Sequence, residues 1–191
     1  MSEEIEAKIR VLDPDAFRRR MAARGRSLGE TVFEVNRLFD DAAGSLRARG
    51  SALRVREEFR PADGACLRTI LTFKGPRKAD SRVKRRPEFE LQVEAAEPLV
   101  QILQALGMEE AFRYEKRRTA FHGGRCEVVL DDVPYLGWFA EVEGPTEEAV
   151  LGELADLGLA DEPIIRRGYV RLLTKHLASI GRDPMRAVFD E

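Results

Sequence analysis

The sequence predicts an α+β protein built on an antiparallel sheet of eight strands. Eight segments alternate between apolar and polar residues, which is the period of a β-strand. Turn signals such as Pro61–Gly64 and Gly123-Gly124 join several of these segments directly, as hairpins do. Segments with helical spacing lie between the others, so the class is α+β with an antiparallel sheet.

The expected strands share one pattern, an apolar face that can pack beneath helices and a strongly charged opposite face. In the second strand, for example, Phe33, Val35, Arg37 and Phe39 alternate with polar positions. The expected strands cover residues 3–12, 30–41, 52–59, 65–74, 86–94, 112–122, 125–132 and 137–144.

Helices are predicted where the period changes from two to nearly four residues. Asp13-Pro14 is a typical start, a capping side chain followed by proline in the first turn, and Gly25 ends that helix. Further helical segments are expected in a short piece within 42–50, around 99–106, after Gly144-Pro145-Thr146, and over 166–179.

Length and composition limit the protein class. With 191 residues we expect one domain over 1–180 and a C-terminal tail over 181–191. Lys and Arg (32) nearly balance Asp and Glu (34), which argues against a nucleic-acid-binding protein. There is neither a long apolar run nor a leader pattern, so we expect no membrane segment and a cytoplasmic location. Cys66 and Cys126 have no metal-ligand spacing and are expected to be small buried residues.

The charged strand faces carry both signs in similar numbers. The acids on them are Glu4, Glu6, Glu88, Glu90, Asp131, Glu141 and Glu143. The bases on them are Lys8, Arg54, Arg56, Lys74, Arg86, Lys116 and Arg118. An open sheet could leave this face in water, whereas a closed barrel of eight strands would enclose it and hold one small ligand.

A polyphosphate with divalent cations is the ligand that satisfies both signs. Arg and Lys bind phosphate oxygens, and clustered carboxylates bind hard cations such as Mg²⁺ or Mn²⁺. Three acid pairs, Glu4/Glu6, Glu88/Glu90 and Glu141/Glu143, place two carboxylates on one strand face. Such a pair can share or flank a metal ion.

Residues 75–87 differ from their surroundings because they contain six basic residues and one acid. A solvated loop explains this composition. A mobile basic lid that attracts an anionic ligand explains it as well.

Taken in order, these residues resemble the CYTH superfamily of triphosphate tunnel enzymes. The resemblance covers about residues 3–175 and is closest to the class IV adenylate cyclase-like branch. Its motifs are Glu4-Ile5-Glu6-Ala7-Lys8, Asn36–Asp40, Gly50–Arg56, Thr72–Gly75, Glu88–Glu90, Lys116–Arg118, Leu130-Asp131, Phe139–Gly144 and the closing stretch from Gly168.

The resemblance implies an eight-stranded antiparallel tunnel with helices packed outside, and roles for its charged residues. Lys8, Arg54, Arg56, Lys74, Lys116 and Arg118 would hold the phosphate chain, with Lys8, Arg56 and Lys116 also acting in catalysis. Arg86 is added from strand parity alone. Glu4, Glu6, Glu141 and Glu143 would bind Mg²⁺ or Mn²⁺, with Asp131, Glu88 and Glu90 nearby as ligands or for charge balance.

The resemblance also implies a metal-dependent reaction at a triphosphate. One alternative is hydrolysis of tripolyphosphate, ATP or thiamine triphosphate. The second is cyclisation of ATP to cAMP and pyrophosphate, and a third, from another class, is a non-catalytic polyphosphate or nucleotide-binding module. The motif residues are common to the two reactions. The family likeness allows a homodimer.

Overall fold

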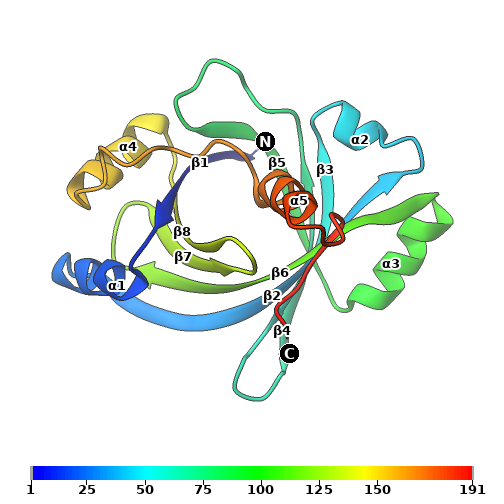
Figure 1. Ribbon diagram of the computed structural model, residues 1–191, viewed down its shortest axis with the longest axis horizontal. Helices are drawn as coiled ribbons and strands as arrows, with labels where there is room; N and C mark the ends of the chain where they lie inside the picture. The colour runs from blue at the N-terminus through cyan, green and yellow to red at the C-terminus, as the bar shows by residue number, and fades with distance from the viewer. Residues whose placement is uncertain (1, 191) are drawn as a thin grey trace.

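Eight antiparallel strands close into a barrel in the computed structural model, which describes residues 2–190 (Figure 1). The strands follow one another around the barrel in the order β2-β3-β4-β5-β1-β8-β7-β6, and β6 pairs back with β2. The alternation allowed either an open sheet or a closed barrel. The pairing of β6 with β2 shows that the barrel is closed. The eight strands are β1 (Ser2–Val11), β2 (Ser27–Asp41), β3 (Ala52–Phe59), β4 (Cys66–Lys74), β5 (Lys84–Val93), β6 (Met108–His122), β7 (Glu127–Val133) and β8 (Gly137–Glu143).

The strand register places the charged positions beside one another on the inner face. Around β1, Glu6 is the cross-strand partner of Lys84 on β5 and of Glu143 on β8, while Lys8 faces Glu141. Cross-strand partners on one face lie close enough for their side chains to interact. The register therefore turns an alternating sequence pattern into a continuous charged lining.

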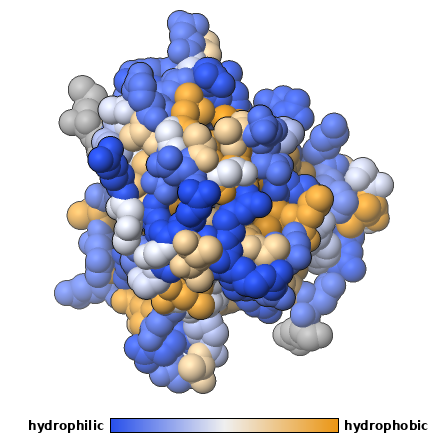
Figure 2. All heavy atoms as spheres, turned by 90° about the vertical axis from the view of Figure 1, so that its left-hand side faces the viewer, coloured by the Kyte–Doolittle hydropathy of each residue, from blue (hydrophilic) through white to orange (hydrophobic). Residues whose placement is uncertain are grey.

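Two helices cover the outer faces of β1, β7 and β8. These are α1 (Pro14–Ala23) and α4 (Glu147–Asp156), and their buried residues share one hydrophobic cluster with the apolar side chains of the three strands. Asp13 caps α1 by accepting hydrogen bonds from the amides of Asp15 and Ala16. Figure 2, which faces this side of the molecule, shows mostly hydrophilic residues with scattered hydrophobic ones, because the apolar sides of both helices are turned inward.

A third helix, α3 (Ala96–Ala105), covers another part of the wall. Its residues Val100 and Leu103 pack with Phe39 of β2 and Val55 of β3. A one-turn helix, α2 (Ser45–Ala48), connects β2 to β3, and the side chain of Asp40 accepts hydrogen bonds from its first amides.

The last helix, α5 (Tyr169–Ser179), lies at the centre of the ring of strands in Figure 1. Its buried residues pack against Phe112 of β6 and Phe139 of β8. Phe139 is two residues from Glu141 on the same strand face, so α5 rests on the same inner face that carries the charges. This helix therefore covers one end of the barrel interior, which places its N-terminal residues beside the charged lining.

The segment after α5 returns to the barrel. A two-residue strand, β9 (Arg186–Ala187), runs parallel to β6 and pairs with Arg113 and Tyr114. Ala187 is fully buried. The residues expected as a tail thus include a segment that packs on the barrel wall.

The predicted elements are all present, and several bounds differ. β2 begins at Ser27 instead of residue 30 and β6 at Met108 instead of residue 112, because the pairing of these two strands extends from Ser27/His122 to Asp41/Met108. The strand expected at 86–94 begins at Lys84, because its antiparallel pairing with β1 extends to Glu6. Lys84 therefore belongs to the barrel wall instead of the preceding loop. Cys126 is buried as expected, but Cys66 is exposed because it begins β4, where the hairpin leaves the barrel. Among residues 2–190, no helix is long and apolar enough to span a membrane.

Candidate active site

The barrel encloses a cavity of about 1530 Å³. Each of the eight strands contributes at least one lining residue, and α2 and α5 contribute others. Of the predicted site residues, the following line it: Glu4, Glu6, Lys8, Arg54, Arg56, Lys74, Arg86, Glu88, Glu90, Lys116, Arg118, Glu141 and Glu143. Asp131, the remaining one, is fully buried within the wall.

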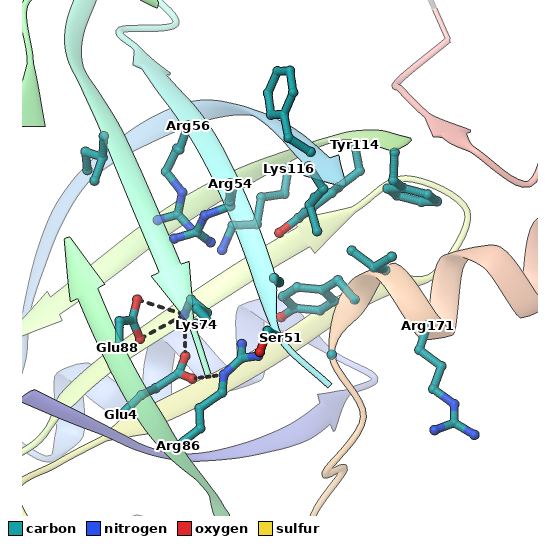
Figure 3. A pocket seen from close by; sticks show the side chains of 18 of the residues that line it. Glu4, Ser51, Arg54, Arg56, Lys74, Arg86, Glu88, Tyr114, Lys116 and Arg171 are labelled. Carbon is teal, nitrogen blue, oxygen red and sulfur yellow. Dashed lines mark hydrogen bonds and ion pairs between the residues drawn. The ribbon is translucent and has the colours of Figure 1, made fainter. Parts of the chain in front are cut away.

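One wall of the cavity is organised around Glu4 (Figure 3). Its Oε1 lies 2.6 Å from Lys74 Nζ and 2.9 Å from Lys84 Nζ, and its Oε2 accepts a hydrogen bond from Arg86 Nε at 2.7 Å. Burial alone would raise the pKa of Glu4, but the three positive charges hold it well below its ordinary value. Lys74 also pairs with Glu88 at 2.9 Å. A single carboxylate thus gathers cations from β4 and β5.

The charged form of Lys74 is destabilised, whereas that of Glu4 is stabilised. Burial and the charge of Arg54 lower its pKa to about 8, although Glu4 and Glu88 favour the charged form. Around this ammonium group positive charges are closely packed, and an additional anion would stabilise them.

The opposite wall is organised around Glu34, which sequence analysis did not select. Its carboxylate lies 3.2 Å from Arg56, 3.4 Å from Lys116 and 3.6 Å from Arg118. Burial would raise the pKa of Glu34, but these three charges hold it well below its ordinary value of 4.5. Asn36, two residues along β2, accepts a hydrogen bond from Arg56.

Asp131, which is buried in the barrel wall, also pairs with Lys116 and Arg118. It accepts two hydrogen bonds of 2.7 Å from Arg118 and one of 3.0 Å from Lys116. Arg118 also pairs with Glu141, whose other oxygen is 3.1 Å from Lys8. Because its oxygens are already occupied and it does not line the cavity, Asp131 orients cations better than it could bind a metal ion.

Tyr169 connects α5 to both walls. Its hydroxyl donates a hydrogen bond of 2.9 Å to Asp131, and Lys8 Nζ lies 3.8 Å from the centre of its ring. An ammonium group over an aromatic face is held by a cation–π interaction. Tyr169 therefore fixes the position of Lys8 while it docks the helix over the barrel end.

Arg54 has unused hydrogen-bonding capacity. One terminal nitrogen donates to Thr72 at 3.1 Å and lies 3.5 Å from Glu90. Its Nε is buried and has no hydrogen-bond partner within residues 2–190. A buried donor without a partner is costly, so this group indicates a place where a ligand oxygen would be favourable. In Figure 3, Arg54, Arg56 and Lys116 converge on the same part of the cavity.

The carboxylates have the donor chemistry for Mg²⁺ or Mn²⁺, and one of them is unpaired. Glu143 makes no ion pair within residues 2–190, and the loss of surrounding water together with the charges of Glu4 and Glu6 raises its pKa to about 7. Lys84 bridges Glu4 and Glu6 at 2.9 Å each. In residues 2–190 no three acid, His or Cys side chains are grouped as a ready-made metal site. The residues fit the ion by chemistry, and an ion there would compete with Lys84.

The residues missed from the sequence are Glu34, Lys84 and Tyr169. Glu34 was on the polar face of an expected strand, but its neighbours Asn36 and Leu38 did not mark that face as charged. Lys84 has the same strand parity as Arg86 and could have been found by extending the strand by two residues. Tyr169 belongs to the closing stretch from Gly168 that carries part of the resemblance, but its role depends on the docking of α5 and was not assigned from the sequence.

The buried carboxylate of Glu34 predicts a pH dependence of stability. Because its pKa is lower in the folded state, its contribution is present above about pH 4.5 and is lost as pH falls toward the folded-state value. We expect Glu34→Gln to reduce the slope of unfolding free energy against pH, between about pH 5 and 3, by up to about 1.4 kcal/mol per pH unit. Urea unfolding in EDTA measures this.

The control is Glu97→Gln, since Glu97 is exposed on α3 and forms no ion pair within residues 2–190. Its curve should run parallel to that of the wild type. A Glu34→Gln curve that is also parallel would show that Glu34 is not held ionised by the cavity cations.

Comparisons with known proteins agree with this architecture. The chain matches the family model described as "CYTH domain" over residues 2–169. A protein of Methanocaldococcus jannaschii described as "putative adenylate cyclase" is 29% identical over 178 residues, covering 88% of this chain and 97% of that protein.

Solved structures share the fold. The PH1819 protein of Pyrococcus horikoshii has a TM-score of 0.77 at 24% identity, covering 90% of this chain and 98% of that one. A protein of Hippeastrum, described as a "putative adenylyl cyclase" with a dominant triphosphatase activity, has a TM-score of 0.62 at 20% identity, covering 94% and 97%. The family model matches residues 2–169, which include all eight barrel strands. The chain therefore belongs to the CYTH domain family.

Proposed function

We propose that this protein is a divalent-metal-dependent enzyme that hydrolyses an inorganic or organic triphosphate inside its barrel. The observation that carries the proposal is the convergence of buried cations from several strands on one cavity, where the Nε of Arg54 has no hydrogen-bond partner among residues 2–190. Triphosphate is the small anion whose charge and many oxygens match such a lining.

The cations would bind and orient the phosphate chain. Arg54, Arg56 and Lys116 lie on one side of the cavity, and Lys74 and Arg86 on the other (Figure 3). A chain between them can be contacted from both sides, which fixes the terminal phosphorus for in-line attack. The positive charges also stabilise the negative charge that builds up on the transferred group.

The carboxylates would hold Mg²⁺ or Mn²⁺, with Glu6, Glu141 and Glu143 as the principal candidates. A bound divalent ion supplies charge neutralisation at the phosphate oxygens and activation of water. In hydrolysis the oxygen of water forms a bond to the terminal phosphorus, and the bond between that phosphorus and the bridging oxygen breaks. Orthophosphate leaves, and the bridging oxygen stays with the diphosphate.

The second candidate is cyclisation of ATP, which is favoured by the similarity to the Methanocaldococcus jannaschii protein. There the ribose 3′-oxygen would bond to the α-phosphorus and pyrophosphate would leave. Hydrolysis needs the charges described above, the divalent ion and water. Cyclisation needs in addition a defined place for the nucleoside, so hydrolysis is the leading proposal.

Product analysis separates the candidates. The protein is incubated with tripolyphosphate, ATP or thiamine triphosphate, each with Mg²⁺ or Mn²⁺. We expect orthophosphate and the corresponding diphosphate. Formation of cAMP and pyrophosphate from ATP would identify a cyclase instead. Tight binding without turnover would identify a binding module and contradict the proposed catalysis.

Glu143 provides a direct test of the metal site because its loss breaks no ion pair within residues 2–190. We expect Glu143→Gln to raise the metal concentration for half-maximal turnover by about tenfold or more, with its melting temperature near that of the wild type. Glu97→Gln serves as control. An unchanged metal dependence would remove Glu143 from the metal site.

Arg54 tests the phosphate-binding role. We expect Arg54→Ala to raise KM for tripolyphosphate by about tenfold or more, since a charge-assisted hydrogen bond contributes roughly 1.5–3 kcal/mol. Arg54→Lys should recover only part of this, because lysine lacks the planar fork of donors. Arg125→Ala, an exposed position in the β6–β7 turn, is the control. Wild-type kinetics in Arg54→Ala would show that Arg54 does not contact the substrate.

A further inference from the structure

The chain after α5 forms a strap on the end of the barrel, which we call the C-terminal strap (residues 182–190). It pairs with β6 through β9 and continues across β6 toward the C-terminus, as the red segment of Figure 1 shows. The match to the family model ends at residue 169, before the strap begins, so the family likeness does not describe it.

The strap completes the barrel wall where β7 is too short to do so. β7 pairs with β6 over Arg117–Phe121 only, so Arg113 and Tyr114 lie beyond its end. β9 pairs with these two residues, and the amide of Arg113 donates a hydrogen bond of 2.9 Å to the carbonyl oxygen of Met185. Backbone groups on a strand edge need partners, so the strap satisfies an edge that β7 leaves open.

One strap residue belongs to the packing beneath α5. Ala187 is fully buried and shares a hydrophobic cluster with Tyr114 and Tyr169. The ring centres of the two tyrosines are 6.4 Å apart, and the ring of Tyr169 lies 3.8 Å from Lys8 Nζ. Met185 of the strap also lines the cavity. A continuous set of packed side chains therefore joins the strap to a cation of the site.

The strap is anchored on the outer face of the barrel by Phe189. Its ring centre lies 3.9 Å from the guanidinium carbon of Arg117 and 6.2 Å from the ring centre of Phe33. Its amide donates a hydrogen bond of 2.9 Å to Glu115. Glu115 and Arg117 flank the cavity-lining Lys116 on β6, so their side chains point outward. The strap thus holds β6 from both faces.

The two ends of the strap meet at Tyr135, in the turn between β7 and β8. Arg182 donates a hydrogen bond of 2.8 Å to the Tyr135 hydroxyl and lies 3.2 Å from the carboxylate of Asp190. Both charged side chains are exposed, and exposed ion pairs contribute little. Ala187 is the one fully buried residue of the strap. A short segment held by so few contacts can open locally while the barrel stays folded.

We propose that the C-terminal strap is a positioning element for the barrel site, with Phe189 as its anchor. The docked strap holds Tyr169 against Lys8, and release of the strap lets both side chains move away from the ligand. The inference rests on the proposed function, because the ligand concerned is the triphosphate in the barrel. If the docked form binds that ligand better, the ligand must favour docking by the same factor.

The test measures binding of tripolyphosphate by titration calorimetry in EDTA, where metal-dependent turnover does not occur. The variant is Phe189→Ala, and Phe189→Tyr is the conservative replacement. The matched control is Phe89→Ala. Phe89 also has a ring contact, with Phe73 at 6.4 Å, but it lines neither the cavity nor the cluster beneath α5. Melting temperatures verify that each variant is folded.

We expect Phe189→Ala to weaken tripolyphosphate binding by about fivefold or more, because only the docked fraction binds with full affinity. Phe189→Tyr keeps the aromatic anchor and should restore most of the affinity. Phe89→Ala should bind as the wild type does.

A double-mutant cycle with Tyr169→Leu separates positioning from a general effect on stability. Leucine keeps an apolar side chain on α5 but removes the ring over Lys8 and the hydroxyl that reaches Asp131. If the strap acts through Tyr169, adding Phe189→Ala to Tyr169→Leu should change the affinity by less than about twofold. A strap that only stabilises the barrel would give the same loss in both backgrounds.

Hydrogen exchange measures the reciprocal effect. The amides of Arg113 and Phe189 both donate to partners across the strap contact. In the wild type, tripolyphosphate should slow their exchange by up to the same factor by which Phe189→Ala weakens binding. In Tyr169→Leu this slowing should be absent.

Three results would overturn the inference and leave the proposed function standing. They are wild-type affinity in Phe189→Ala, an equal loss of affinity with and without Tyr169, and exchange of the strap amides that does not respond to the ligand. If the wild type does not bind tripolyphosphate at all, the proposed function fails and the inference fails with it.

Discussion

The mutual neutralisation of buried charges inside a closed barrel is the constraint on which the rest of this structure depends. Once β2 pairs with β6, every second residue of each strand must point into the interior. An isolated buried charge there would cost several kcal/mol, so the buried charges form ion pairs. Glu4 and Glu34 meet this requirement by each gathering three cations. A folded barrel tolerates this charged lining because its acids and bases form ion pairs with one another.

This neutralisation also prepares the cavity for a ligand. The cations lose their water when the protein folds, so this desolvation free energy is not spent again when a ligand binds. Carboxylates hold the cations in position. A phosphate chain could then exchange with carboxylate oxygens instead of with bulk water, and a metal ion could take over carboxylates that lysines release. Within residues 2–190, Arg54 has a buried nitrogen without a hydrogen-bond partner and Glu143 forms no ion pair, so one group of each sign has capacity for a ligand. They mark where phosphate and metal would add interactions at little cost.

The helix α5 makes the two ends of the barrel different. It covers one end of the interior, and Tyr169 at its start contacts Lys8 and Asp131. Packing of the helix and placement of the cations are therefore coupled through one side chain. The same helix presents the exposed bases Arg171 and Lys175, which also line the barrel cavity, so it is both a structural cover and the place where the positive lining reaches the surface.

The sequence by itself determined the strands, their inward faces and most of the charged residues. Alternation with period two is a local property, so Glu4, Glu6 and Lys8 could be placed on one face without any knowledge of their neighbours. The ordered motifs then carried the family resemblance. Local alternation could not show whether the sheet closes, because closure is a pairing between β2 and β6, which are far apart in the chain.

Only the tertiary structure decided which charges form partners. Lys84 bridges Glu4 and Glu6 because β5 pairs with β1, and Glu34 meets Lys116 and Arg118 because barrel closure pairs β2 with β6. The same holds for Tyr169, which is an ordinary apolar helix residue in the sequence and a platform for Lys8 in the fold. Sequence pattern fixes the direction in which a side chain points, whereas the partner it meets depends on strand register and helix docking, which are set by long-range packing.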